Sequence, residues 1–296
     1  MFGYSDIYCV FCVLLLTNYQ AYMQYTINVR GRLLDLSQPL VMGILNATPD
    51  SFYSGSRKQT EAEIADRANQ IVAEGGRIID VGAFSTRPGG ADEVSLEEET
   101  ERLKHALQIV RREQPDAIVS VDTYRPLVAR RCVEEFGADI INDVSEGGKT
   151  GIVGKEIHEE GDMFQTVAQL GVPYILMSVQ PTLEKMMHNF AAEVQRLRDL
   201  GAKDIILDPG YGFGKTLAQN YEIMNRAERL LELDLPVLVG VSRKSMIYKL
   251  IGGDPTTALN GTTVLHTVSL QKGASILRVH DVKEAFEAIR IVQQLG

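Results

Sequence analysis

Residues 117–122, with the sequence Ala-Ile-Val-Ser-Val-Asp, contain the pattern that decides the fold: a short, mostly apolar run that ends on a polar side chain. Seven other runs of this kind occur: 39–45 before Asn46, 77–79 before Asp80, 140–141 before Asn142, 173–177 before Ser178, 205–207 before Asp208, 237–241 before Ser242, and 275–279 before His280. Apolar runs without polar alternation are typical of parallel strands that are buried on both faces. Their polar ends would gather at one face of the sheet, where parallel α/β proteins bind their ligands.

Segments with helical periodicity lie between these runs. Ser95 with Glu98, and Asp281 with Glu284, have the spacing of capping boxes at the starts of two such helices. The apolar side chains that follow recur at helical spacing, which predicts that they form core faces. They are Leu96, Leu103, Leu107 and Val110 in the first helix, and Ala285, Ile289 and Val292 in the second.

Eight runs that alternate with helices predict a single (β/α)8 TIM barrel better than an open sheet. The chain has 296 residues and is 45% hydrophobic. That length suits one barrel of about 250 residues or two smaller domains. Because no long linker, internal repeat or low-complexity tract divides the sequence, one domain is the stronger prediction. Ahead of the first run, residues 25–36 predict two short strands around Arg30-Gly31-Arg32, which would form a β-hairpin that plugs the bottom of the barrel.

The first 22 residues differ from the rest of the chain. Residues 7–16 are all apolar or aromatic, but they are too few to cross a bilayer, which takes about 20 residues. A signal peptide, the alternative, would have basic residues ahead of this run, whereas the first basic residue is Arg30. We therefore expect residues 1–22 to be an upstream extension, with Met23 as the natural start and residues 23–296 as the barrel domain.

The charge and the cysteine content of the chain limit the classes of binding partner and the cellular compartment that we expect. The net charge of −9 argues against a nucleic-acid surface, which would need clustered Lys and Arg. Cys132 falls in a predicted helix, and Cys9 and Cys12 lack a second Cys/His cluster that would complete a metal site. Because no disulfide framework is visible, we expect a cytoplasmic protein, without nucleic-acid or membrane partners.

Three polar residues at neighbouring strand ends predict an anion site. Arg278 and His280 end the eighth run, and the loops after strands seven and eight form the recurrent phosphate site of this barrel. Asn46 ends the first run and lies beside them once the barrel closes. Its oxygen is a suitable ligand for Mg²⁺, which proteins commonly hold with one or two oxygens together with phosphate and water. The three residues predict a pocket for a diphosphate and Mg²⁺.

Four further polar residues would ring the same mouth of the barrel: Asp122, Asn142, Asp208 and Lys244. The carboxylate of Asp208 can accept two parallel N–H donors, and the amide of Asn142 can both donate and accept. Lys244 offers a cation to a carbonyl or a ring nitrogen. This set predicts the recognition of a polar, planar ligand.

Long or glycine-rich loops are expected to cover the mouth. Residues 47–59 and 82–94 exceed the usual two to six residues of βα loops, and long loops of this kind often act as lids. Residues 210–216 are rich in glycine, but Pro209 stands where a P-loop requires glycine. We interpret this segment as a loop that brings Phe213 and Lys215 to the mouth.

These motifs together resemble those of dihydropteroate synthase. The segments that carry the resemblance are GILNATPDSF (43–52), STRPGG (85–90), VDT (121–123), IND (141–143), LDPGYGFGK (207–215), SRKS (242–245) and RVHD (278–281). The resemblance runs from about Tyr25 to the C-terminus and includes the order and spacing of the motifs. It implies a homodimeric, Mg²⁺-dependent barrel enzyme of folate synthesis. Such an enzyme joins 6-hydroxymethyl-7,8-dihydropterin diphosphate to p-aminobenzoate, releases diphosphate, and is a sulfonamide target.

The resemblance also implies roles for individual residues. Asn46 would be the magnesium ligand and would act in catalysis with Lys244, Arg278 and His280. The positions that match binders of the pterin diphosphate are Thr86, Asp122, Asn142, Asp208, Lys244, Arg278 and His280. Positions near the arylamine are Arg87, Pro88, Phe213, Lys215 and Ser245, and those of the first mobile loop are Asp50 and Phe52. One departure from the family is visible: the family usually has a His-Met pair after the fifth strand, where this chain has Met177-Ser178-Val179.

Two other functions stay open from the sequence. A pterin-binding methyltransferase barrel would share the Asp and Asn residues at the strand ends, but it would not use the diphosphate pocket and would need a corrinoid partner. A pterin-binding protein that has lost its chemistry is the second alternative, for which Ser178 could be a sign. No obvious Ser/His/Asp or Cys/His nucleophile set is present. That absence fits a reaction in which diphosphate departs and an uncharged arylamine attacks.

Overall fold

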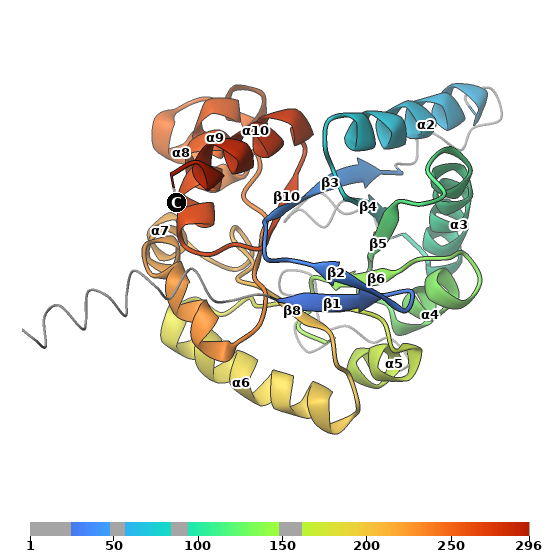
Figure 1. Cartoon of the computed structure of the whole chain (residues 1–296), viewed down its shortest axis with the longest axis horizontal. Helices are drawn as coiled ribbons and strands as arrows, with labels where there is room; N and C mark the ends of the chain where they lie inside the picture. Colours follow the sequence, from blue (N-terminus) through green and yellow to red (C-terminus); the bar gives the residue numbers. More distant parts are fainter. Residues whose placement is uncertain (1–24, 48–56, 84–93, 148–161, 296) are drawn as a thin grey trace, which may run out of the picture.

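Eight parallel strands form a ring in the computed structural model of the chain (Figure 1). The structure describes residues 25–47, 57–83, 94–147 and 162–295. The strands are β3 (Leu40–Asn46), β4 (Ile78–Gly82), β5 (Ile118–Asp122), β6 (Ile140–Asp143), β7 (Tyr174–Met177), β8 (Ile205–Asp208), β9 (Leu238–Val239) and β10 (Ile276–Val279). They pair in the order β8-β7-β6-β5-β4-β3-β10-β9, and a parallel bridge between Leu207 and Val237 joins β8 to β9. The predicted (β/α)8 barrel is confirmed.

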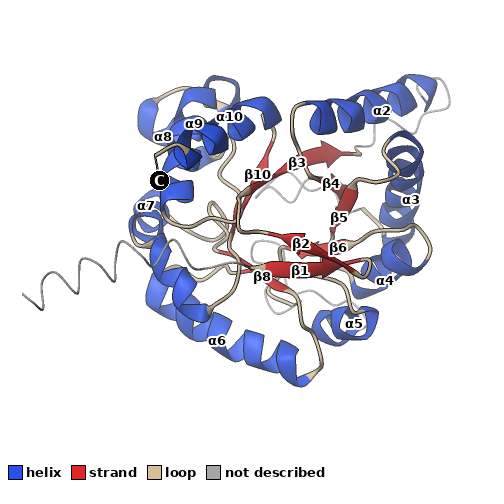
Figure 2. Cartoon of the chain, in the orientation of Figure 1, coloured by secondary structure: helices blue, strands red, loops and turns tan. Residues whose placement is uncertain are grey.

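Helices surround the strands on the outside of the ring (Figure 2). They are α2 (Arg57–Ala73), α3 (Leu96–Glu113), α4 (Pro126–Glu134), α5 (Met163–Leu170), α6 (Leu183–Asp199), α7 (Leu217–Asn225), α8 (Ser245–Ile251), α9 (Leu259–Gln271) and α10 (Val282–Gln293), with 3-10 helices at Ala227–Leu233 and Pro255–Thr257. The cap of α3 is as predicted, because Ser95 accepts a hydrogen bond from the Glu98 N–H. The predicted side-chain cap of α10 is wrong: the Asp281 carboxylate binds Arg243 instead. Among the described helices, none has both the length and the apolar character needed to cross a membrane.

Apolar residues form one core outside the ring and a second core inside its lower half. The outer core lies between strands and helices and includes the predicted Leu103, Leu107 and Val110 face of α3. The inner core contains one residue from most of the strands: Met42, Ile78, Ile140, Ile175, Ile206, Leu238 and Ile276. These strands bury side chains on both faces, as their uninterrupted apolar runs predict.

A β-hairpin closes the bottom of the barrel. Its strands β1 (Thr26–Val29) and β2 (Arg32–Asp35) are antiparallel, and Ile27 and Val29 pack into the inner core. Arg30 and Gly31 both have positive φ angles, 52° and 75°, as a two-residue turn between twisted strands requires. The hairpin lies across the ring in Figure 1, and the predicted plug is confirmed.

Asp139 ties this hairpin to the barrel. Its buried carboxylate, just before β6, accepts hydrogen bonds from Arg30, from Arg111 (2.8 Å) and from the Val119 N–H (2.8 Å).

We expect Asp139→Asn to lower the free energy of unfolding by about 3 kcal/mol, because a buried ion pair that loses one partner leaves an uncompensated charge. Urea unfolding measures this loss. The exposed Asp35→Asn serves as the control, and a loss within experimental error of that control would contradict the role of Asp139.

Two strands differ from the predicted runs in ways that matter for the site. The seventh run, 237–241, forms a strand only at Leu238–Val239. Asp80, which we expected at the end of a strand, lies in the middle of β4, where it is in register with Ile44 and Ser120. Its side chain is completely buried. Asp80 is therefore a polar residue within the barrel wall.

Candidate active site

The predicted site residues that the structure describes lie at the carboxyl end of the barrel or just inside it. Asn46, Asp122 and Asp208 are the last residues of β3, β5 and β8, and Asn142 lies one residue before the end of β6. Arg278 lies within β10, His280 follows it, and Lys244 immediately precedes α8. Asp50, Phe52, Thr86, Arg87 and Pro88 fall outside the described residues, as does most of both long loops, so the predicted lids stay a prediction.

Arg278 crosses the barrel interior to two carboxylates. Its Nε donates to Asp80 (2.6 Å) and its Nη2 donates to Asp122 (2.6 Å). Burial acts to lower the pKa of Arg278, but the charges of the two aspartates outweigh it and raise that pKa. Burial also raises the pKa of Asp122 to about 7, although Arg278 opposes this shift. The buried carboxyl of Asp122 therefore holds a proton more readily than a free aspartate does.

The same interior presents hydrogen-bond acceptors without partners. The Nδ2 of Asn142 donates to Asp80 (3.2 Å), which leaves the Asn142 Oδ1 without a donor in the described part of the chain. The Oδ1 atoms of Asp80 and Asp122 also lack donors there. Buried acceptors of this kind are normally satisfied. The arrangement favours a ligand that is rich in N–H donors.

Asp208 and Lys244 form the opposite side of this interior. One oxygen of Asp208 accepts a hydrogen bond from the Gly210 N–H (2.7 Å), and burial raises the pKa of this carboxyl although Lys244 opposes the shift. Lys244 Nζ donates to the Tyr211 carbonyl (2.5 Å) and lies 4.6 Å from the centre of the Phe213 ring. Burial lowers the pKa of Lys244 to about 8. A planar ring between them would meet an acceptor at Asp208 and a donor at Lys244.

Lys215 lies in the glycine-rich loop and is held by three backbone carbonyls. Its Nζ donates to the carbonyls of Ser178 (2.8 Å), Gly210 (3.0 Å) and Phe213 (3.2 Å). Burial lowers the pKa of Lys215 to about 7, against the attraction of Asp208. The loop therefore holds Lys215 against its own backbone and within the electrostatic reach of Asp208.

Asn46 and His280 share the edge where β3 and β10 pair. The two strands are in register, with Val279 opposite Gly43. Arg67 of α2 joins them, because it donates to the carbonyls of Ile44 (3.1 Å) and His280 (2.6 Å). The Asn46 side chain is exposed and makes no hydrogen bond to another described residue. The predicted closure of the ring thus brings the Asn46 and His280 strand ends together.

The donor set near Asn46 fits a magnesium ion that also binds phosphate. No cluster of three or more His, Cys, Asp or Glu side chains suited to a metal occurs in the described residues. A site made entirely of carboxylates and imidazoles is therefore not present there. Mg²⁺ retains several waters and needs only one or two protein oxygens when a phosphate is bound. The exposed amide oxygen of Asn46, on the predicted anion side of the mouth, meets that requirement.

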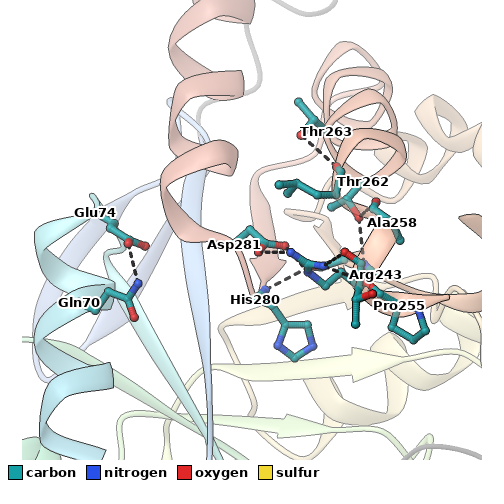
Figure 3. A network of polar contacts seen from close by, with 12 residues as sticks. Gln70, Glu74, Arg243, Pro255, Ala258, Thr262, Thr263, His280 and Asp281 are labelled. Atoms are coloured by element: carbon teal, nitrogen blue, oxygen red, sulfur yellow. Dashed lines mark hydrogen bonds and ion pairs between the residues drawn. The ribbon is translucent and has the colours of Figure 1, made fainter. Parts of the chain in front are cut away.

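A network of polar contacts holds the loops after β9 and β10 together (Figure 3). Arg243 binds both oxygens of Asp281 through Nε and Nη2, each at 2.8 Å. Its Nη1 also donates to the carbonyls of Pro255 and Thr256. In addition, the His280 N–H donates to Ser242 Oγ (3.1 Å). Because Lys244 and His280 are the chain neighbours of Arg243 and Asp281, this network fixes both predicted ligand contacts.

Three contributors to the site were missed from the sequence. The sequence pattern places Asp80 only at the end of an apolar run, and it assigns no role to Arg67 or to Glu146, although Glu146 follows the Asn142-Asp143 motif. Glu146 is buried and binds Ser178, the residue at which the chain departs from the family pattern. The available signal for Glu146 was the Glu-Gly-Gly sequence at 146–148, which begins three residues after the end of β6. The contribution of Asp80 depends on the register of the strands, and that of Arg67 depends on the packing of α2, so neither could be predicted from the sequence.

The described histidines other than His280 lie on helices. His266 is buried in α9, and burial lowers its pKa to about 4. His188 is exposed on α6, while His105 is half-buried on α3. Cys132 is buried, as expected for a packing residue. Ser245 begins α8 directly after Lys244, at the edge of the site.

Comparison with known proteins agrees with this geometry. The sequence model of the family described as "Pterin binding enzyme" matches residues 42–280. Dihydropteroate synthase of Escherichia coli (strain K12) is 38% identical over 279 residues, which cover 89% of this chain and 94% of the relative. This chain belongs to the dihydropteroate synthase family. A Streptococcus pyogenes dihydropteroate synthase is 36% identical over 86% of this chain and 95% of its own length.

Solved structures of family members share the fold. Dihydropteroate synthase of Xanthomonas albilineans with 4-aminobenzoic acid has a TM-score of 0.80 and 32% identity, and covers 92% of this chain and 98% of its own. The Yersinia pestis enzyme in a sulfonamide drug complex has a TM-score of 0.80 and 34% identity, over 92% and 99% of the two chains. The barrel fold is therefore shared with these family members.

Proposed function

We propose that this protein condenses 6-hydroxymethyl-7,8-dihydropterin diphosphate with p-aminobenzoate to give 7,8-dihydropteroate and diphosphate. The protein is a transferase of folate biosynthesis, as its family membership indicates. The observation that carries the proposal is the acceptor-rich barrel interior beside an anion edge. A pterin diphosphate has the matching halves: a flat ring with several N–H donors and a chain of negative charge.

The pterin half of the substrate fits the interior. Asn142 and Asp122 have acceptor oxygens without partners in the described chain, and Asp208 retains one oxygen for a ligand. The amino group and ring N–H groups of a pterin would satisfy these acceptors. Lys244 would donate to a ring nitrogen or to the carbonyl on the ring. Binding would thus turn buried, unsatisfied groups into paired ones.

The diphosphate half fits the edge formed by Asn46, Arg278 and His280. When bound, Mg²⁺ would neutralise charge on the diphosphate as it departs. Asn46 would hold the ion through its amide oxygen. Arg278 Nη1 makes no hydrogen bond within the described residues, so it can bind a phosphoryl oxygen while Asp80 and Asp122 hold the other nitrogens. His280, which directly follows the same strand, adds a further donor.

The chemistry needs charge stabilisation more than a strong base. Departure of diphosphate from a methylene that is conjugated to an electron-rich pterin leaves a delocalised cation, so we propose a largely dissociative reaction. The chain must then stabilise the leaving group and exclude water that would trap the cation. An arylamine is uncharged near pH 7, so its nitrogen attacks as it stands and then loses one proton to the departing diphosphate or to water. We assign water exclusion to the loops 47–59 and 82–94.

The arylamine would approach from the glycine-rich side of the mouth. Phe213 offers a ring face, and Lys215 and Ser245 lie near the same loop and helix start. Arg87 and Pro88, in the second long loop, would complete this side. Two copies of the chain would assemble as a homodimer in the cytoplasm, as the family resemblance implies.

Product formation tests this proposal directly. We expect the full chain, given both substrates and Mg²⁺, to release 7,8-dihydropteroate, detected by chromatography and mass spectrometry. Removal of Mg²⁺ with EDTA should abolish the reaction, and added Mg²⁺ should restore it. Pterin binding without product would favour a binding protein, whereas methyl transfer to or from a corrinoid would favour the methyltransferase alternative.

A further inference from the structure

A tight turn after β6 presents an acidic side chain to the interior. Asp143 accepts hydrogen bonds from the N–H groups of Ser145 (2.8 Å) and Gly147 (2.9 Å) and from the Tyr174 hydroxyl (2.6 Å). Within this turn Glu146 has a φ angle of 53°, a conformation that costs a residue other than glycine about 1 kcal/mol or more. Such a backbone persists only where its surroundings enforce it. Here the turn directs Glu146 inward, where only 1% of its surface is exposed.

The Glu146 carboxylate binds the segment that follows β7. Its Oε1 accepts hydrogen bonds from Ser178 Oγ (2.9 Å) and from the Val179 N–H (2.7 Å). These are the two positions at which the chain departs from the usual His-Met pair of the family. The serine hydroxyl is small enough to lie between the two elements and to donate to the carboxylate. Glu146 and Ser178 therefore form a matched pair.

Ser178 in turn contacts the glycine-rich loop. Its N–H donates to the Asp208 carbonyl (2.9 Å), and its own carbonyl accepts from Lys215 Nζ (2.8 Å). The approach is close, because a Cβ added to Gly210 would lie 2.3 Å from the Ser178 carbonyl oxygen. A continuous chain of contacts thus runs from Glu146 through Ser178 to Lys215.

Few charged groups of the described residues lie near enough to Lys215 to stabilise the positive charge of its ammonium group. The charged groups that act on it in the described chain are Asp208 of β8, Lys244 before α8, and Glu146 after β6. Asp208 and Glu146 attract the ammonium group, while Lys244 repels it. The three groups that bind Lys215 Nζ directly are uncharged carbonyls. Loss of Glu146 would leave Asp208 alone against Lys244 and burial.

We propose that Glu146 is a positioning residue for Lys215: through Ser178 it holds a carbonyl that binds the ammonium group, and its negative charge offsets the charge of that group. This inference rests on the proposed function only in placing Lys215 at the substrate site. Ser178, at which the chain departs from the family pattern, then has a role: it links the Lys215 contact to a carboxylate in the turn after β6.

Competitive labelling of lysine measures the protonation state of the Lys215 amine, and it does not require the protein to be catalytically active. Trace acetic anhydride acetylates only uncharged amines, and peptide mass spectrometry reports the extent at Lys215 across neutral pH. For the unmodified chain we expect a midpoint at about 7, where burial places the pKa of Lys215. In Glu146→Gln the midpoint should fall by roughly one pH unit, because an attractive charge is lost. An unchanged midpoint would overturn the inference.

Two variants separate this effect from general damage. Glu193→Gln removes another buried carboxylate, one on α6 that is bonded to Asn189, and it should leave the Lys215 midpoint unchanged. Ser178→Ala keeps the carbonyl but loses the hydroxyl donor, and it should raise the limiting labelling rate of Lys215 severalfold. If Glu146→Gln does not fold, the limiting labelling rate of Lys215 in Ser178→Ala tests the inference instead. A rate equal to that of the unmodified chain would refute the positioning role of Glu146.

The pH profile of product formation links the inference to the reaction. In Glu146→Gln the alkaline limb of kcat/KM for the pterin diphosphate should move to lower pH in parallel with the labelling midpoint. If the unmodified chain makes no dihydropteroate, the proposed function fails while the labelling result still decides the role of Glu146. If the unmodified chain is active and neither quantity moves, only the role of Glu146 is refuted.

Discussion

Asp208→Asn is expected to weaken binding of the pterin substrate about 100-fold, because two unfavourable changes coincide. The variant loses a buried, charged acceptor, of which only one oxygen accepts a hydrogen bond from a described residue. It also places an N–H donor against a donor of the ligand, which leaves both unpaired in a buried site. Calorimetric titration with a pterin that lacks the diphosphate isolates this half of the pocket.

The matched control for this variant lies on the same strand. Asp204 immediately precedes β8 at the bottom of the barrel, where its carboxylate accepts from the Asn28 N–H of the hairpin (3.0 Å). Asp204→Asn should leave pterin affinity unchanged. If Asp208→Asn bound the pterin with an affinity close to that of Asp204→Asn, the pterin could not lie against β8.

Arg278→Met is expected to reduce kcat by about 100- to 1,000-fold, the usual effect of removing one preorganised donor from a transition state. The negative charge of the leaving diphosphate grows as its bond breaks, so the loss should appear in kcat more than in KM. Steady-state kinetics with saturating p-aminobenzoate measures both. A kcat within a few fold of the unmodified value would contradict the dissociative scheme.

The same variant has a second expected effect, on stability, because Asp80 and Asp122 lose their common partner. Breaking a buried ion pair typically costs about 3–5 kcal/mol. The folded-state pKa of Asp122 is already raised to about 7 from 3.8, so the folded state binds the proton more tightly than the unfolded state. Stability contributed by this group therefore falls as pH rises from about 4 to about 7.

The dependence on pH gives this stability effect its own test. Without Arg278 the pKa of Asp122 should rise further, so the fall in stability should continue to higher pH. Arg278→Met should then be less destabilising in mild acid than above neutrality, as measured by urea unfolding across pH. A pH-independent loss would mean that the variant only creates a cavity.

The sequence predicted the ring and most of its polar rim because both depend on local patterns. Asn46, Asp122, Asp208 and His280 each follow a buried apolar run, and parallel strands place such ends at one mouth. The hairpin was predictable for a similar reason, since Arg30-Gly31 adopts the paired positive φ angles of a tight turn. Where a feature depends only on one strand and the few residues that follow it, the structure agrees with the prediction from sequence.

The sequence could not predict contacts that depend on register across the ring. Arg278 meets Asp80 across 198 positions of sequence, and only the pairing of the intervening strands places them together. The Asp281 carboxylate had two possible partners, and Arg243 outcompeted the helix start because it offers two charge-assisted bonds at once. Glu146 depends on a turn whose backbone is unusual for its residue type. Tertiary contacts decided each of these cases.

A crystal structure of the chain with pterin diphosphate and Mg²⁺ tests the central claim most directly. The claim is that one mouth of the barrel binds both halves of the substrate. We predict density for the pterin ring among Asp122, Asn142, Asp208 and Lys244, with the diphosphate and the ion at Asn46 and His280. Density for the ligand at the hairpin end of the barrel, or on its helical surface, would contradict the account.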